Sequence, residues 1–123
     1  MIRLEHVTKE FAPGRGIFDV SFTVEPGTIF GFIGPNGSGK STTLRHLMGL
    51  LAADGGKATI GGFDCWKQSK EVKQLVGYLP GEISLPGDMA GADMLDLMQR
   101  LHGSDPARRQ LLLKRFPFET KTK

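Results

Sequence analysis

The stretch from Thr28 to Leu51 constrains the fold of this chain more than any other part of the sequence. It opens with residues 28–33, which are apolar at successive positions, as expected of a strand buried on both faces. The glycine-rich residues 34–41 follow, and leucine and methionine then recur at helical spacing over residues 44–51. This order predicts a strand, a glycine loop and a helix in direct succession, which is typical of an α/β fold.

The glycine loop has a spacing with a chemical meaning. Residues 34–41 read Gly-Pro-Asn-Gly-Ser-Gly-Lys-Ser and match the P-loop pattern G-x-x-x-x-G-K-[ST] in full. Glycines let backbone N–H groups turn inward around a phosphate chain. The N-terminus of the following helix presents further N–H groups and its positive dipole end to the same anion. We therefore predict that the loop binds the phosphates of ATP together with Mg²⁺.

The residue types in the loop suit separate parts of the nucleotide. Lys40 is expected to reach the β- and γ-phosphates and to stabilise their charge, and the Ser41 hydroxyl is expected to coordinate Mg²⁺. The backbone and hydroxyl of Thr42 are expected to serve the α-phosphate. The predicted phosphate-binding set is Asn36, Gly37, Ser38, Gly39, Lys40, Ser41 and Thr42.

Alternating apolar and polar residues predict an antiparallel pair of strands before the loop, at residues 2–9 and 18–24, joined by a turn at 13–16. The elements expected after the loop helix are a short strand at 58–60, a helix at 69–74 capped by Ser69, a strand at 75–79, a loop over 80–91, an amphipathic helix at 94–101 and a last helix from Ser104 to about Phe116.

Composition excludes several classes of function. With 39% hydrophobic and 24% charged residues the chain is typical of a folded soluble protein. Its 16 basic residues are scattered among 13 acidic ones, which favours a solvated surface of mixed charge, and we expect no nucleic-acid partner. The single cysteine, Cys65, cannot form an internal disulfide, which suits a reducing cytoplasm. No apolar run reaches the roughly 18 residues of a membrane span, so any role at a membrane is expected to depend on a partner.

The histidines and the Cys65-Trp66 pair have plain structural interpretations. His6, His46 and His102 lie far apart without metal-ligand spacing, and we expect surface or partly packed side chains. Cys65 and Trp66 are expected to be a turn residue and a packing aromatic. The methionines near residues 89–98 are expected to pack in a core or an interface, and a groove for a partner stays open as an alternative.

Four segments carry a resemblance to a known family: Phe18-Asp-Val-Ser-Phe22, residues 31–44 around the P-loop, Met48-Gly-Leu-Leu51 and Val76-Gly-Tyr-Leu-Pro80. Through them, residues 1 to about 105 resemble the opening of an ABC transporter ATP-binding domain. The resemblance implies a leading antiparallel β subdomain at 1–28, a RecA-like P-loop core at 29–80, and a Q-loop-equivalent region with the start of a helical subdomain at 81–123. It also implies that Phe11, at the end of the first strand, stacks on the adenine ring.

The chain departs from the family pattern after Pro80. Gly81 stands where the family usually has a glutamine that touches Mg²⁺ or the attacking water, and Glu82 follows it. Glu82 supplies the missing oxygen or is a solvated loop carboxylate; both interpretations stay open. The sequence also lacks the family's signature loop, its second acidic strand end and its switch histidine. We therefore expect a truncated, N-terminal portion that supplies the Walker A half of the site and is inactive in hydrolysis by itself.

The resemblance implies an ATP-binding subunit that couples ATP binding and hydrolysis to membrane transport. Its implied partners are a transmembrane permease and a second ATP-binding subunit in a head-to-tail dimer, at the inner face of the cell membrane in the cytoplasm. Because a P-loop strand with little cover exposes apolar surface, we also expect marginal stability and association with a partner. A soluble ABC-type ATPase without a transport role, a P-loop GTPase or small kinase, and a non-catalytic ATP-binding fragment remain alternatives.

Overall fold

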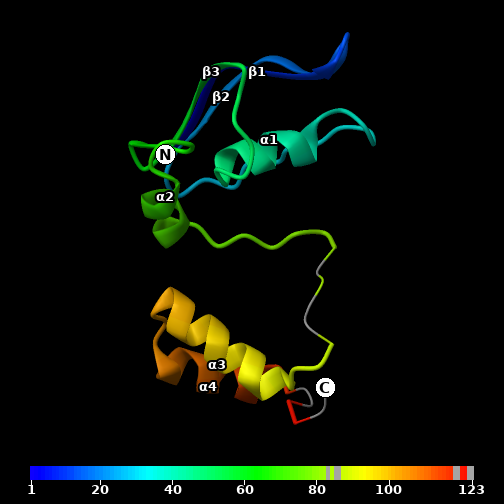
Figure 1. Cartoon of the computed structure of the whole chain (residues 1–123). Coiled ribbons are helices and arrows are strands. Elements are labelled where there is room, and N and C mark those ends of the chain that lie inside the picture. Colours follow the sequence, from blue (N-terminus) through cyan, green and yellow to red (C-terminus); the bar gives the residue numbers. More distant parts are fainter. Residues whose placement is uncertain (83, 85–86, 118–119, 122–123) are drawn as a thin grey trace. The chain divides into compact units, whose positions relative to one another are not determined.

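Two long strands, β1 (Ile2–Ala12) and β2 (Arg15–Val24), form the antiparallel hairpin that the sequence predicts (Figure 1). The computed structural model describes residues 1–82, 84, 87–117 and 120–121. β3 (Gly55–Ile60) pairs with the other edge of β1, and β4 (Phe63–Asp64) pairs with β3, so the antiparallel sheet has the order β2-β1-β3-β4. The strand predicted at 58–60 is confirmed and is longer than expected, whereas β4 was not predicted.

The helix α1 (Lys40–Leu47) lies alongside this sheet and confirms the helical spacing after the glycine loop (Figure 1). It buries Thr43, His46 and Leu47 on the side that meets the sheet. The helix ends before Met48, so it is shorter than the apolar pattern to Leu51 predicts. The core of the first 78 residues consists of Leu4, Val7, Ile17, Leu47, Ile60, Cys65 and Val72.

The prediction of a buried strand at residues 28–33 is wrong. In the described part of the chain no strand pairs with this segment, and Ile29 and Ile33 are 103% and 93% exposed. A strand exists only where a neighbour accepts and donates its backbone hydrogen bonds, and none of the four described strands pairs with this segment. The segment is held instead by side chains: the ring of Phe22 stacks on Phe30 at a centroid distance of 5.1 Å.

A second strand prediction, at residues 75–79, is also wrong. Leu75 is the last residue of α2 (Ser69–Leu75), and the residues after it form no regular element. Val76 has extended torsions of φ −119° and ψ 131°, so the local conformation suits a strand but no described strand lies beside it. Ser69 does not cap α2 either, because the N-cap is Gln68 and its side chain makes no capping hydrogen bond.

The second unit, residues 79–123, contains α3 (Gly91–His102) and α4 (Pro106–Arg115), which confirms both predicted helices. Asp105 caps α4, since its carboxylate accepts a hydrogen bond of 2.9 Å from the Ala107 N–H. The two helices are joined by an ion pair between Arg109 and Asp96, and the guanidinium lowers the pKa of that carboxyl. Part of the predicted 80–91 loop lies outside the described residues. None of the helices in the described ranges is both long and apolar enough to cross a bilayer.

His46 and Cys65 are buried more deeply than the sequence predicts, with exposed fractions of 3% and 1%, whereas Trp66 is mostly exposed and is no packing aromatic. Burial raises the pKa of the Cys65 thiol to about 11. The Nδ1 of His46 lies 2.7 Å from the Leu51 carbonyl, and because a carbonyl only accepts, Nδ1 carries the proton of the neutral ring.

We expect the stability of the first unit to fall as the pH drops below about 6.5, and His46 to be the cause. Desolvation lowers the pKa of His46 in the folded chain, and the Lys9 ammonium acts in the same direction, against the Leu51 carbonyl and Asp54. The unfolded chain therefore takes up a proton at a higher pH than the folded chain does. The measurement is the urea midpoint at pH 7.5 and at pH 5.5, followed by Trp66 fluorescence.

His46→Gln should flatten this dependence on pH, and His102→Gln, at an exposed position of α3, should leave it unchanged. An unaltered slope in the His46 variant would show that other groups control the acid response.

The core assignment also predicts unequal effects of removing leucine side chains. Leu4 is 2% exposed and Leu50 is 57% exposed. Leu4→Ala should lower the free energy of unfolding by about 2–5 kcal/mol, because it leaves a cavity in the core. Leu50→Ala removes the same atoms from the surface and should change it by no more than about 0.5 kcal/mol. Urea titration of both variants tests this, and similar losses would contradict the packing described above.

Candidate functional site

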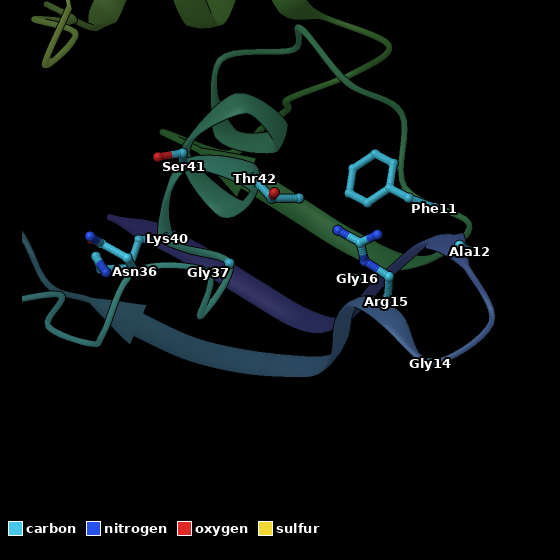
Figure 2. A pocket seen from close by; sticks show the side chains of 11 residues that line it. Phe11, Ala12, Gly14, Arg15, Gly16, Asn36, Gly37, Lys40, Ser41 and Thr42 are labelled. Carbon is cyan, nitrogen blue, oxygen red and sulfur yellow. The ribbon is translucent and has the colours of Figure 1, made fainter.

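One cavity of about 720 Å³ brings the glycine loop, the start of α1 and the tip of the β1–β2 hairpin together (Figure 2). Its lining consists of Phe11, Ala12, Gly14, Arg15, Gly16, Asn36, Gly37, Gly39, Lys40, Ser41 and Thr42. Two of these residues are cationic and, among the described lining residues, none is acidic. The cavity is therefore an electropositive site with an aromatic ring at the hairpin side.

The Lys40 side chain folds back onto the glycine loop. Its ammonium donates hydrogen bonds to the carbonyl oxygens of Gly34 and Pro35, the latter at 2.8 Å, and to the Ser38 hydroxyl at 3.3 Å. Lys40 is also the first residue of α1, where backbone N–H groups have no acceptor within the helix. The positive charge of the side chain and the positive end of the helix dipole thus lie at the same place.

Gly39 connects this loop to the hairpin. It is the N-cap of α1 and has φ +92°, a left-handed conformation that side chains disfavour. A Cβ atom at Gly39 would also lie only 2.3 Å from Cγ2 of the buried Ile17 in β2. Only glycine therefore allows the loop to turn at this point and to approach β2 closely.

The hairpin tip carries Phe11, which is 59% exposed. Glu10 pairs with Gly16 and Ala12 pairs with Arg15, so Phe11 is one extra residue in β1 at a shift in strand register. Such bulges change the direction in which a side chain points. Figure 2 shows the Phe11 ring on the same side of the hairpin as the Arg15 guanidinium, and both line the cavity.

The structure brings most of the predicted site residues together. The predicted residues that line the cavity are Phe11, Asn36, Gly37, Gly39, Lys40, Ser41 and Thr42. Ser38 is not among the lining residues, and its hydroxyl contacts the Lys40 ammonium instead. Glu82 belongs to the second unit, and its role remains a prediction. Arg15 lines the cavity but was not among the predicted site residues. The signal in the sequence was its place two residues after Pro13, in the turn that follows Phe11.

Comparison with known proteins agrees with this arrangement. Residues 17–122 match the family model described as ABC transporter. The chain belongs to this family. The resemblance seen in the sequence is thereby confirmed, and the family match begins after Phe11 and Arg15.

Two relatives from Bacillus subtilis (strain 168) illustrate the similarity. The ABC transporter ATP-binding protein NatA is 41% identical over 107 residues, which cover 83% of this chain and 44% of NatA. The linearmycin resistance ATP-binding protein LnrL is 33% identical over 103 residues, covering 84% of this chain and 33% of LnrL. The chain thus spans less than half the length of either of these family members.

Solved structures of the family share the fold. The ATP binding subunit of an ABC transporter superimposes with a TM-score of 0.84 at 23% identity, covering 99% of this chain and 53% of that one. A dimeric ATP-binding cassette bound to ADP and Pi gives a TM-score of 0.69 at 21% identity, covering 89% and 52%. The predicted fold class, a mixed α/β fold of ABC ATP-binding domains, is confirmed by these neighbours.

The contact between Gly39 and Ile17 predicts a specific loss of stability. Gly39→Ala combines a strained φ with a steric clash, whereas Gly37→Ala has only a strained φ of +84°, since a Cβ there meets nothing within 4 Å. We expect Gly37→Ala to lower the free energy of unfolding by about 1–2 kcal/mol and Gly39→Ala to lower it by about 1–3 kcal/mol more. Urea unfolding of both variants gives the comparison.

The double variant Gly39→Ala with Ile17→Ala isolates the clash. Because Ile17→Ala removes the Cγ2 atom, the double variant should be less destabilised than the sum of the two single variants, by about 0.5–3 kcal/mol. Additive losses would show that β2 and the loop do not touch as described.

Proposed function

We propose that this chain supplies the phosphate-binding half of the ATP site in an ABC transporter ATP-binding subunit. The single observation that supports this most strongly is the shared cavity of Lys40, the α1 N-terminus and the hairpin tip, which has two cations and no acidic group in its described lining. Cations and unpaired N–H groups without a competing carboxylate favour a polyanion.

The lining groups fit a phosphate chain. A Cβ atom at Gly37 would contact nothing within 4 Å, so the loop leaves open space beside its backbone. In the proposed complex Lys40 pairs with the β- and γ-phosphates, and the backbone N–H groups of residues 37–42, contributed by Gly37, Ser38, Gly39, Lys40, Ser41 and Thr42, donate to the phosphate oxygens. Asn36 lines the loop side of the same cavity.

Ser41 fits the requirements of a Mg²⁺ ligand. Mg²⁺ prefers oxygen ligands and is commonly shared between a protein and nucleotide phosphates. Ser41 lines the cavity next to Lys40, and its hydroxyl is proposed to hold the metal, while Thr42 serves the α-phosphate. A bound Mg²⁺ would neutralise phosphate charge during hydrolysis.

Phe11 is proposed to hold the base. It lines the end of the cavity formed by the hairpin, whereas Lys40 lines the end formed by the loop (Figure 2). An exposed aromatic ring can stack on a purine, and this interaction contributes roughly 1–3 kcal/mol.

We further propose that the whole protein couples ATP binding and hydrolysis to movement of a substrate through a transmembrane permease. Support comes from the relatives, which include a multidrug transporter ATP-binding protein, a resistance protein and a manganese transport protein. A second ATP-binding subunit in a head-to-tail dimer completes the proposed assembly, at the cytoplasmic face of the membrane. Glu82 is proposed to provide the oxygen that the usual glutamine gives in this family.

Lys40→Ala is the decisive test of the nucleotide site. Loss of a charge-assisted hydrogen bond to phosphate should weaken binding of Mg·ATP by about 10- to 100-fold. Lys57→Ala removes the same charge from an exposed position of β3 outside this cavity and should leave the affinity unchanged. Isothermal titration of ATP into the 123-residue chain and both variants measures the effect.

Two outcomes would contradict the proposal. Equal affinity of Lys40→Ala and the unaltered chain would show that the loop does not bind phosphate. Tighter binding of GTP than of ATP in competition would favour a guanine-nucleotide protein instead.

A further inference from the structure

Arg15 is a cation at the cavity that neither the P-loop pattern nor the matched residues 17–122 include. It is the first residue of β2 and pairs with Ala12 across the hairpin. None of the ion pairs found among the described residues involves Arg15, so no carboxylate of the described chain neutralises it. A guanidinium that faces an electropositive cavity without a protein counter-ion is suited to an anionic ligand.

The backbone holds Arg15 tightly on both sides. Before it, the two-residue connection Pro13-Gly14 is closed by a hydrogen bond of 2.9 Å from the Gly14 N–H to the Glu10 carboxylate. After it, Gly16 presses against β1, since a Cβ atom there would lie 1.8 Å from the Lys9 carbonyl oxygen. The position of Arg15 is therefore set by the hairpin and does not depend on a flexible loop.

The place of Arg15 within the cavity indicates which part of a nucleotide it would meet. Figure 2 shows its guanidinium beside the Phe11 ring, at the side of the cavity formed by the hairpin. Thr42 lines the same cavity from the first turn of α1. A nucleotide with its base on Phe11 and its terminal phosphates at Lys40 has its α-phosphate between these two ends.

We propose that Arg15 binds the α-phosphate of the nucleotide and so connects the hairpin to the glycine loop through the ligand. The inference rests on the function proposed above and adds a residue to that site. The planar guanidinium forms two parallel hydrogen bonds to phosphate oxygens, which an ammonium cannot do. Because ATP, ADP and AMP all have an α-phosphate, Arg15 contributes equally to the binding of each.

Arg15→Gln tests this role through its dependence on the ligand. The variant should bind ATP, ADP and AMP about tenfold more weakly, by the same factor for all three, and should bind adenosine as the unaltered chain does. Arg15→Lys keeps the charge without the planar guanidinium. Its affinity for these nucleotides should therefore lie between that of the unaltered chain and that of Arg15→Gln. Affinities come from competition with a fluorescent ATP analogue, using the 123-residue chain.

Arg3→Gln is the matched control. Arg3 is an exposed arginine in β1 of the same hairpin, does not line the cavity and pairs with Glu5 at 3.0 Å. Arg3→Gln removes the same charge as Arg15→Gln, but outside the cavity, so the affinities for ATP and ADP should stay unchanged. The urea midpoint of each variant, read from Trp66 fluorescence, shows whether the first unit is still folded.

Four outcomes separate the possibilities. Unchanged ATP and ADP affinity in Arg15→Gln, beside a clear loss in Lys40→Ala, overturns the role of Arg15 and leaves the proposed function standing. Weaker adenosine binding would place Arg15 on the nucleoside, and a loss that spares AMP would place it on the β- or γ-phosphate; both overturn the assignment to the α-phosphate. Failure of the unaltered chain to bind ATP overturns the proposed function and this role together.

Discussion

The candidate site depends on the close approach of Gly39 to Ile17. Ile17 is buried in the sheet and Gly39 starts α1, so their contact places the glycine loop directly against β2. Residues at the turn of the same hairpin, next to Ile17 in the sequence, form the other wall of the cavity. A side chain at position 39 would separate the two walls, because interiors are packed too densely to absorb an additional atom at 2.3 Å.

Electrostatics at the cavity follow from this geometry. Two cations and the N-terminus of α1 share one space, and no described lining residue is acidic. Like charges brought together repel each other, and an anion between them relieves this repulsion. The hydrogen bonds that Lys40 donates to loop carbonyls offset part of this repulsion, whereas Arg15 has no carboxylate partner among the described residues. The positive charge of the cavity thus favours a negatively charged ligand.

The sequence predicted the local elements well and the pairing of strands poorly. The hairpin, the loop helix and both helices of the second unit were correct, because alternation, helical spacing and the Asp105-Pro106 cap act within a few residues. Residues 28–33 and 75–79 were wrongly predicted as strands. An apolar run indicates a tendency to be buried, but a strand also requires a neighbour that no local pattern specifies.

The residue types of the glycine loop already specify its local geometry and its charge. The order of Gly37, Gly39 and Lys40 specifies a turn, a helix start and a cation over adjacent positions, and each of these is a short-range property. That Phe11 and Arg15 face the same cavity becomes known from the folded chain alone. Their directions follow from a shift of register between β1 and β2 and from the contact of Ile17 with Gly39. Both are interactions between distant residues, whose partners become known only when the chain is folded.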